Sequence, residues 1–354
     1  MGNNTSITEH KRHYYRELLC IGVPIIIGQL GTIILGFADT LMIGHHSTEE
    51  LAAAGLVNNI ITFILVSYMG FSYGLTPIIG KLYGMEKTDK IGQKVKNSFF
   101  ANMVVGVIFS LALIILYFNL HRIGQPEELL ALIRPYFIVN LISVLFVGVF
   151  NTLKQFLDGI GNTKVAMWVM IMGNIVNIFG NWVLIYGVGP CPEMGLLGAG
   201  ISTLASRVLM AVAMVGIIAG TKEYREYRNN IIASRINGAD FLEMNRLGWP
   251  VALQLALESG AFTLSCVMVG WLGTIPLAAH QVMITISQLF YLVLSGMAAA
   301  LAIRVSHFVG QNDFAAVRRN AYDGWRLNLL FSLCMGIPVL LLRHQIGGWF
   351  NDNV

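Results

Sequence analysis

Residues 24–55 read PIIIGQLGTIILGFADTLMIGHHSTEELAAAG, and residues 250–281 read PVALQLALESGAFTLSCVMVGWLGTIPLAAHQ. The two stretches align without a gap at a displacement of 226 residues, the distance from Pro24 to Pro250. Prolines, glycines and a turn motif coincide: Pro24 with Pro250, Met42 with Met268, Gly44 with Gly270, and Leu-Ala-Ala at 51–53 with 277–279. Apolar helices share single residues by chance, but ungapped coincidence of these types is much rarer. The chain therefore contains an internal repeat.

The composition around the repeat is that of a membrane protein. Of the 354 residues, 55% are hydrophobic and only 12% are charged, whereas soluble domains carry about 25% charged residues. This excludes a soluble or disordered chain. The net charge of +4 is too small to indicate a nucleic-acid partner. The sequence predicts an all-α polytopic membrane protein whose partner is the lipid bilayer.

Apolar stretches of the length that crosses a membrane recur along the whole chain. A helix needs about 20 apolar residues to cross a hydrocarbon core of about 30 Å. The stretches are 20–43, 55–79, 98–118, 132–156, 165–186, 198–219, 249–271, 277–302 and 327–342. We therefore expect nine transmembrane helices and a multi-pass protein of the inner cell membrane.

The connections between these stretches differ in charge. Nineteen Lys and Arg residues lie in the N-terminal tail and after the second, fourth, sixth and eighth stretches, against three in the opposite connections. Because basic residues favour the cytoplasmic side, the N-terminus is expected to be cytoplasmic. Nine crossings would then leave Val354 outside.

The repeat also predicts how the chain is divided. Six helices separate the two copies, so both enter the membrane in the same direction, as in the parallel repeats of some secondary transporters. We expect an N-terminal lobe at 1–226 and a partial C-terminal lobe at 227–354. Val354 corresponds to Glu128 of the first copy, before its fourth helix. By its own symmetry, the chain would hold about nine helices of a twelve-helix protein.

Two acids lie within the apolar stretches, where a charge is costly and usually functional. Glu258 lies near the middle of the seventh stretch, and Asp39 lies towards the outer end of the first. Each could bind a proton or cation. Glu258 could instead be a neutral, hydrogen-bonded carboxyl, and Asp39 could reach the membrane surface. The two positions are not equivalent, because Asp39 aligns with Ser265 and Glu258 aligns with Thr32.

Asparagines gather in the fifth stretch, where Asn177 and Asn181 share a helix face with a spacing of four. Their carboxamides could bind Na⁺ or hold a carboxyl, or they could serve only as hydrogen bonds between helices. Asn174 lies in the same stretch, and the same two explanations apply to it. Further polar candidates, each better explained by packing when taken alone, are Asn58, Asn59, Tyr136, Thr203, His280, Gln281 and Tyr291. The sequence contains no motif of hydrolases, thiol enzymes or zinc proteases, so we expect neither an enzyme nor a cofactor.

Residues 28–56, GQLGTIILGFADTLMIGHHSTEELAAAGL, resemble helix 1 and its turn in the multidrug and toxic compound extrusion (MATE) transporters. Further similarity covers LDGIGNTK at 157–164, NIVNIFGNWVLIYG at 174–187, GAGISTLASR at 198–207, and the Glu258 segment through LAAHQ. The resemblance covers nearly the whole chain. It implies two six-helix lobes on either side of a central cavity.

The resemblance also implies roles for particular residues. The family's proton- or sodium-linked aspartate of helix 1 corresponds to Asp39. The polar residues around it correspond to Asn177, Asn181, Thr203 and Tyr136. One subgroup has a second aspartate at the position of Asn181, so its proton-only arrangement of two acids is not matched.

In the C-terminal lobe, a cation-binding glutamate corresponds to Glu258 and an aromatic partner to Tyr291. Glu258 is therefore a possible Na⁺ ligand. The family's partner aspartate of helix 10 would fall beyond Val354.

The function implied by the resemblance is antiport. Amphipathic or cationic small molecules, including drugs and toxins, would leave the cell in exchange for Na⁺ or H⁺ by alternating access, and we expect a monomer. One alternative is a lipid-linked oligosaccharide flippase of the same superfamily, which should have a more cationic cavity. Arg207, expected near an end of the sixth helix, gives that alternative little support. Another is a non-transporting fragment or scaffold.

Overall fold

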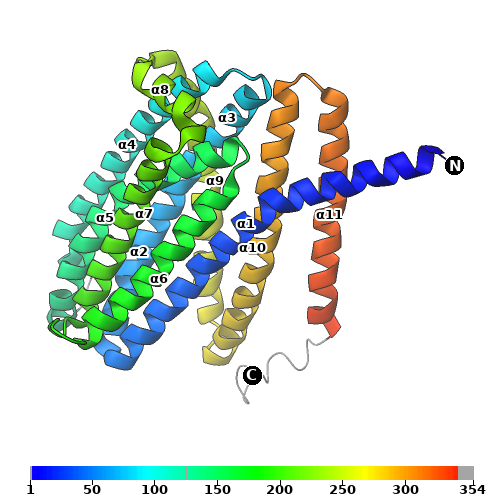
Figure 1. Ribbon diagram of the computed structural model, residues 1–354. Coiled ribbons are helices and arrows are strands. Elements are labelled where there is room, and N and C mark those ends of the chain that lie inside the picture. The colour runs from blue at the N-terminus through cyan, green and yellow to red at the C-terminus, as the bar shows by residue number, and fades with distance from the viewer. Residues whose placement is uncertain (1, 124–125, 342–354) are drawn as a thin grey trace.

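The computed structural model describes residues 2–123 and 126–341, where every long element is a helix (Figure 1). The helices are α1 (Gly2–His46), α2 (Thr48–Tyr73), α3 (Leu75–Gly84), α4 (Thr88–Phe118), α5 (Glu127–Gly159), α6 (Thr163–Tyr186), α7 (Gly195–Gly220), α8 (Arg225–Ala233), α9 (Gly238–Gly270), α10 (Thr274–Gly310) and α11 (Phe314–Leu341). Two 3-10 turns, Leu120–Ile123 and Lys222–Tyr224, complete the described elements. The all-α fold class is confirmed.

Each of the nine predicted stretches corresponds to a candidate membrane span among the described residues. The second span, Thr48–Gly84, consists of α2 and α3, which Gly74 joins in a helical conformation. Helices α1, α4, α9 and α11 each begin ten residues or more before the predicted start of the stretch, so these starts were wrong. An apolar window detects only the part of a helix within the hydrocarbon. Backbone hydrogen bonds let the helix continue into the polar region beyond it.

Helices α1 to α7 form one bundle. Within it α6 packs between α1 and α7, while α5 packs against α2, α4 and α7. Two glycines make room for one buried aromatic residue, since a Cβ at Gly106 of α4 or Gly148 of α5 would collide with Tyr68 of α2. The Tyr68 hydroxyl donates to the backbone oxygen of Asn102 over 2.8 Å. Small residues allow this close helix packing, which drives association in lipid.

The contacts between the two copies follow the repeat. A Cβ added at Gly22 of α1 would lie 2.7 Å from Met297 Sδ of α10. A Cβ added at Gly248 of α9 would lie 2.7 Å from Phe71 Cδ2 of α2. These are one contact made twice, because a displacement of 226 residues converts Gly22 into Gly248 and Phe71 into Met297. The interface is thus self-complementary, as a twofold relation requires, and the parallel repeat is confirmed.

The same symmetry governs a second crossing, between α3 and α10. Gly84 lies against the backbone carbonyl of His307, and Gly310 lies against that of Lys81. The displacement converts Gly84 into Gly310 and Lys81 into His307. Close to this crossing, His307 Nε2 donates to the Gly159 carbonyl of α5 over 2.7 Å. The crossing therefore joins the two copies at the ends of α3 and α10.

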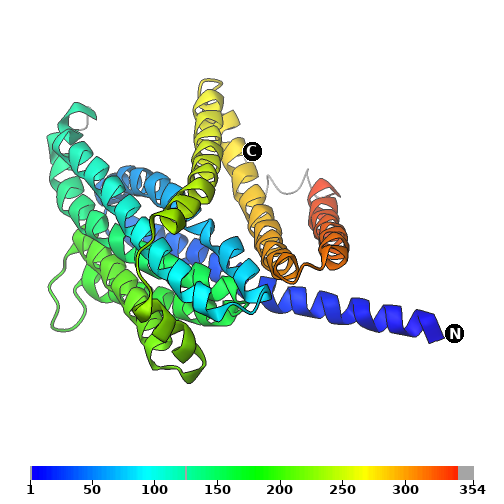
Figure 2. The same ribbon diagram turned by 90° about the horizontal axis from the view of Figure 1, so that it is seen from above.

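The copies separate towards the opposite end. Figure 2 shows the α9–α10 hairpin standing away from the α1–α7 bundle. Correspondingly, only 6% of the most apolar window of α9 is buried, compared with 39% of that of α5. Contacts between the copies include Ser295 Oγ with Gln29 Oε1 at 3.4 Å, in addition to the glycine crossings. The arrangement is closed at one end and spread at the other.

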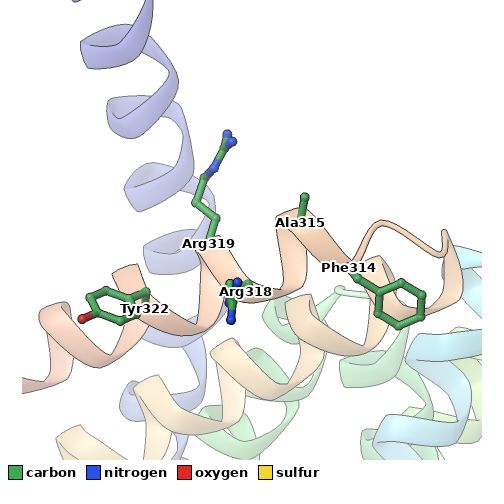
Figure 3. A pocket seen from close by; sticks show the side chains of 5 residues that line it. All are labelled: Phe314, Ala315, Arg318, Arg319 and Tyr322. Atoms are coloured by element: carbon green, nitrogen blue, oxygen red, sulfur yellow. The ribbon is translucent and has the colours of Figure 1, made fainter.

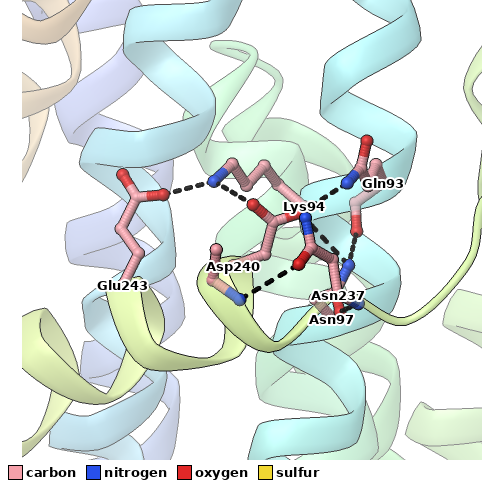
Figure 4. Close-up of polar contacts among 7 residues, drawn as sticks. Gln93, Lys94, Asn97, Asn237, Asp240 and Glu243 are labelled. Atoms are coloured by element: carbon pink, nitrogen blue, oxygen red, sulfur yellow. Dashed lines mark hydrogen bonds and ion pairs between the residues drawn. The ribbon is translucent and has the colours of Figure 1, made fainter.

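A polar cluster fixes the start of α9 on α4 (Figure 4). Asp240, only 9% exposed, accepts hydrogen bonds of 2.7 Å from both Lys94 Nζ and Gln93 Nε2. Lys94 also pairs with Glu243, and Asn97 Oδ1 accepts from the Asn237 backbone over 2.7 Å. The connection between the copies is therefore held along α4. The division at residue 226 falls within α8 and stays a prediction.

Candidate functional site

Asp39 of α1 lies against the asparagines of α6. Asn181 Nδ2 donates to Asp39 Oδ1 over 2.5 Å. Asn177 and Asn181 are both fully buried, with 0% exposure, and their side chains are 3.1 Å apart. The sequence prediction that these two amides share a face is confirmed, and the structure brings both to the aspartate.

The Asn177 carboxamide lies between Asp39 and Thr203. Its nitrogen donates to Asp39 Oδ1 over 3.0 Å, and its oxygen accepts from the Thr203 hydroxyl over 3.1 Å. Because an ionised carboxylate only accepts hydrogen bonds, both amides suit the ionised form of Asp39.

Tyr136 of α5 joins this site through electrostatic interaction with Asp39. Its side chain is 4% exposed, and its hydroxyl donates to Asn58 Oδ1 of α2 over 2.9 Å. A Cβ at Gly200 of α7 would lie 2.9 Å from Tyr136 Cδ2, so this glycine allows the ring to fit between α5 and α7. The four residues expected around the first-lobe acid therefore lie in one polar region, together with Asn58.

Arg207 is the residue that sequence reasoning misplaced. It lies half-way along α7 rather than near an end, because the helix runs from Gly195 to Gly220. Its Nη1 donates to Ser143 Oγ of α5 over 2.5 Å, and its positive charge interacts with the charge of Asp39. The spacing of four from Thr203, already a candidate, could have revealed it. An intramembrane arginine thus accompanies the aspartate.

The second-lobe candidates are also neighbours. The Tyr291 hydroxyl of α10 lies close enough to Glu258 of α9 for the two groups to interact electrostatically. Tyr291 is 50% exposed, in contrast to the buried amides around Asp39. Among the described residues, no group of three His, Cys, Asp or Glu side chains converges to hold a metal ion. Glu258 and Tyr291 together offer a carboxylate and a hydroxyl oxygen.

Comparison with known proteins identifies the family. The MatE family model matches residues 24–183 and 250–353. The chain belongs to the MatE family. It is similar to the probable multidrug resistance protein NorM of Photorhabdus laumondii, with 30% identity over 96% of this chain and 74% of that protein. It is also similar to the multidrug resistance protein NorM of Photobacterium profundum, with 27% identity over 97% of this chain and 75% of that protein.

Solved structures of MatE-like fold superpose along nearly the whole chain. One is a MATE crystal structure in complex with MaD3S, with a TM-score of 0.85 and 20% identity, over 96% of this chain and 76% of that chain. Another is a multidrug resistance MATE family transporter in an outward-facing conformation, with a TM-score of 0.83 and 19% identity, over 96% and 74%. A third is a transporter of the MOP superfamily from Pyrococcus furiosus, with a TM-score of 0.81 and 20% identity, over 95% of this chain and 74% of that chain. The chain is thus a multi-pass membrane protein of a transporter family.

Proposed function

We propose that this protein is a secondary antiporter that exports amphipathic or cationic small molecules in exchange for H⁺ or Na⁺. The observation that carries the proposal is a carboxyl group, Asp39, within a membrane span and held by Asn181 and Asn177. Ionisable groups at such depth serve transport pathways more often than packing. The names of the two bacterial relatives, both multidrug resistance proteins, support xenobiotic substrates.

Coupling rests on the charge of Asp39. Ionised, the carboxylate accepts from Asn181 and from the Asn177 amide, and it attracts a cationic substrate. Protonation removes that charge and turns one carboxyl oxygen into a donor. Hydrogen bonds to a charged acceptor are stronger than those to a neutral one. Proton entry would therefore weaken the hold of the two buried amides on Asp39.

Arg207 makes substrate release depend on that proton. While Asp39 is ionised, the charges of Asp39 and Arg207 offset each other across the lobe interior. Once Asp39 is neutral, the guanidinium keeps its charge without that counter-charge. In a low-dielectric interior this repulsion of a bound cation is stronger than in water. Proton binding thus removes the attraction of Asp39 for a cationic substrate and exposes that substrate to repulsion by Arg207.

Alternating access follows from the repeat. The copies meet at the α3–α10 crossing, on the side that the distribution of basic residues predicts to be cytoplasmic, and spread at the other end. This supports an outward-open state in an inner-membrane protein whose N-terminus is cytoplasmic. Rocking of the lobes about the self-complementary contacts would open the opposite side. We expect the protein to work as a monomer.

In the second lobe, Glu258 and Tyr291 would take part as a cation site. Their two oxygens suit a hard cation such as Na⁺, which prefers oxygen ligands, and the remaining ligands would come from water or from further residues. Because Glu258 lies on a span that is only 6% buried in its most apolar window, ions can approach it from the spread side. The two lobes would thus have different ionic roles.

Efflux of a fluorescent cation from cells that express the protein tests the coupling proposal. Asp39→Asn and Glu258→Gln should each lower gradient-driven efflux, while Glu127→Gln at an exposed position should not. Unchanged efflux in both variants would show the coupling assignment to be wrong. Measuring efflux at several Na⁺ concentrations and fixed pH distinguishes the two coupling ions. Efflux that does not depend on Na⁺ would assign the coupling to protons. A non-transporting scaffold would give no efflux even without substitution.

One observation favours a second candidate, a flippase for a lipid-linked oligosaccharide. Arg207 places a cation in the middle of α7, where it could bind an anionic headgroup phosphate. Its electrostatic neighbour Asp39 works against this, because the pair is neutral overall while Asp39 is ionised. Competition by a pyrophosphate-linked lipid for cation efflux, lost in Arg207→Gln, would favour the flippase.

A further inference from the structure

The first turns of α11 carry an exposed basic surface (Figure 3). Its five residues, which we call the arginine face, are Phe314, Ala315, Arg318, Arg319 and Tyr322, and they line an open hollow of about 750 Å³. Their spacing places them on one side of the helix. Among the side chains that the structure describes, which exclude those of residues 2–14, neither Arg318 nor Arg319 forms an ion pair with an acidic group. Within that part of the protein, the surface has two positive charges without acidic partners.

The repeat identifies the matching surface of the first copy. A displacement of 226 residues converts the arginine face into residues 88, 89, 92, 93 and 96 of α4. In the first copy this surface is covered by α8 and the residues after it. Thr88 Oγ1 donates a hydrogen bond to Glu226 Oε1, and Lys96 Nζ donates to the Ser234 carbonyl over 2.6 Å. At the centre, a Cβ on Gly92 would lie 2.5 Å from Asn230 Cβ and 2.7 Å from its carbonyl carbon.

The residue at that centre differs between the copies. Arg318 of α11 stands where α4 has Gly92, and Arg319 stands where it has Gln93. Since even a methyl group at Gly92 would collide with the backbone of α8, a helix cannot lie on α11 in the way α8 lies on α4. A surface covered by polypeptide in one copy has become an exposed cationic surface in the other. The change points to a ligand other than a packed helix.

We propose that the arginine face of α11 binds the phosphate of an anionic phospholipid headgroup. Guanidinium groups bind phosphate oxygens through paired hydrogen bonds. Tyr322, which is 60% exposed, has the amphipathic ring that favours the membrane–water boundary. The Arg326 guanidinium lies over that ring, 5.0 Å from its centroid, and keeps it in place.

The helix below the arginine face fits the rest of a lipid. Leu329, Leu330 and Leu333 are 43–58% exposed and continue along α11 from Tyr322 into the span Phe314–Leu341. Acyl chains could therefore lie along α11 while the headgroup stays at its beginning. The arginine face is also on the side of the membrane that basic residues predict to be cytoplasmic, where anionic lipids attract Lys and Arg. Charge and position both select an anionic phospholipid.

Native mass spectrometry of the full-length protein in detergent tests the site. With equimolar phosphatidylglycerol and phosphatidylcholine of identical acyl chains, wild type should bind phosphatidylglycerol with a preference on the order of tenfold. Arg318→Gln/Arg319→Gln should lose most of that preference. The matched control Arg235→Gln/Arg246→Gln removes two charges from exposed positions on the same predicted side and should keep it.

Three outcomes would overturn the proposal. Equal binding of the two lipids by wild type would mean that the arginine face does not select an anionic lipid, and that it is either covered by another protein or left uncovered. An equal loss in the control variant would mean that overall charge, not this site, selects the lipid. Displacement of phosphatidylglycerol by a similar concentration of glycerophosphoglycerol, the headgroup without chains, would mean a site for free phosphates. If the glutamine variant fails to fold, Arg318→Lys/Arg319→Lys should still lower the preference by about threefold, because lysine lacks the paired donors.

Discussion

Asp39 and Glu258 lie in two copies of one repeat, yet their surroundings differ in almost every respect. Two fully buried amides approach Asp39, and Arg207 adds a charge to the same region. Glu258 has the half-exposed Tyr291 beside it and lies on a sparsely packed helix. One backbone arrangement therefore holds one acid in a preorganised polar site and another in an open one.

The steric contacts between the copies did not diverge in this way. Gly22 and Gly248 are equivalent, as are Gly84 and Gly310, and each makes the contact of its partner in reverse. A self-complementary interface imposes the same steric limit on both copies, so packing positions stay alike. Polar positions carry no such shared limit and could specialise. The comparison predicts equal effects at the glycines and unequal effects at the acids.

The largest effects are expected at the α3–α10 crossing. Gly84→Leu and Gly310→Leu should each destabilise the protein by about 3 kcal/mol, because the new side chain meets backbone that cannot move aside. The melting temperature in detergent should fall by the same amount in both. Gly36→Leu is the matched control, since a Cβ there meets nothing within 4 Å. A large fall in melting temperature for only one of the two crossing glycines would contradict the twofold relation.

Next in size is the amide that holds the first-lobe acid. Asn181→Leu should slow cation efflux about tenfold, as expected when a hydrogen bond to a charged group is lost. Asn174→Leu on the same helix is the control, because Asn174 Nδ2 is buried without a hydrogen-bond partner in the described structure. Its efflux should change by less than about twofold. Similar losses in the two variants would assign Asn181 to packing alone.

A smaller effect should follow loss of the neighbouring cation. Arg207→Gln should move the midpoint of the efflux–pH profile to higher pH, because without a nearby positive charge Asp39 holds its proton more readily. Ser143→Ala, which frees the guanidinium from its hydrogen bond, should shift the midpoint less. The profile is measured from initial efflux rates. A midpoint that stays fixed in Arg207→Gln would remove this arginine from the coupling site.

The smallest effect is expected in the second lobe. Tyr291→Phe removes one hydroxyl beside Glu258 and should lower Na⁺-dependent efflux only about twofold, since a half-exposed carboxylate can bind water instead. Glu258→Gln in the same assay gives the full contribution of the acid for comparison. A tenfold loss in Tyr291→Phe would show that Glu258 is held as tightly as Asp39, contrary to the comparison above.

Much of this arrangement could be predicted from the order of residues. Nine spans, their common direction and the 226-residue displacement follow from apolar length and from prolines and glycines in matching places. The grouping of Asp39 with Asn177, Asn181, Thr203 and Tyr136 came from family resemblance, and the structure places these residues together. From helix spacing alone, one could predict only that Asn177 and Asn181 lie on the same face of their helix.

Other features needed the fold. Lys154 is one of the nineteen basic residues that the charge pattern assigns to the cytoplasmic side, but it lies within α5 and pairs with the buried Asp158 over 2.6 Å. From the sequence alone, a charged residue at the end of an apolar stretch predicts the start of a loop. Whether it is solvated depends on the neighbouring helices, which hydropathy does not describe.

By itself the sequence determined the class of protein, the spans and the register of the repeat, because these depend on local composition and on matches along one chain. The tertiary structure decided which polar groups meet. Arg207 donates a hydrogen bond to Ser143, the fully buried Asn177 reaches Asp39, and Arg318 is exposed where Gly92 is covered. Each depends on the rotation and separation of different helices. Such distances arise only when side chains from distant segments pack together.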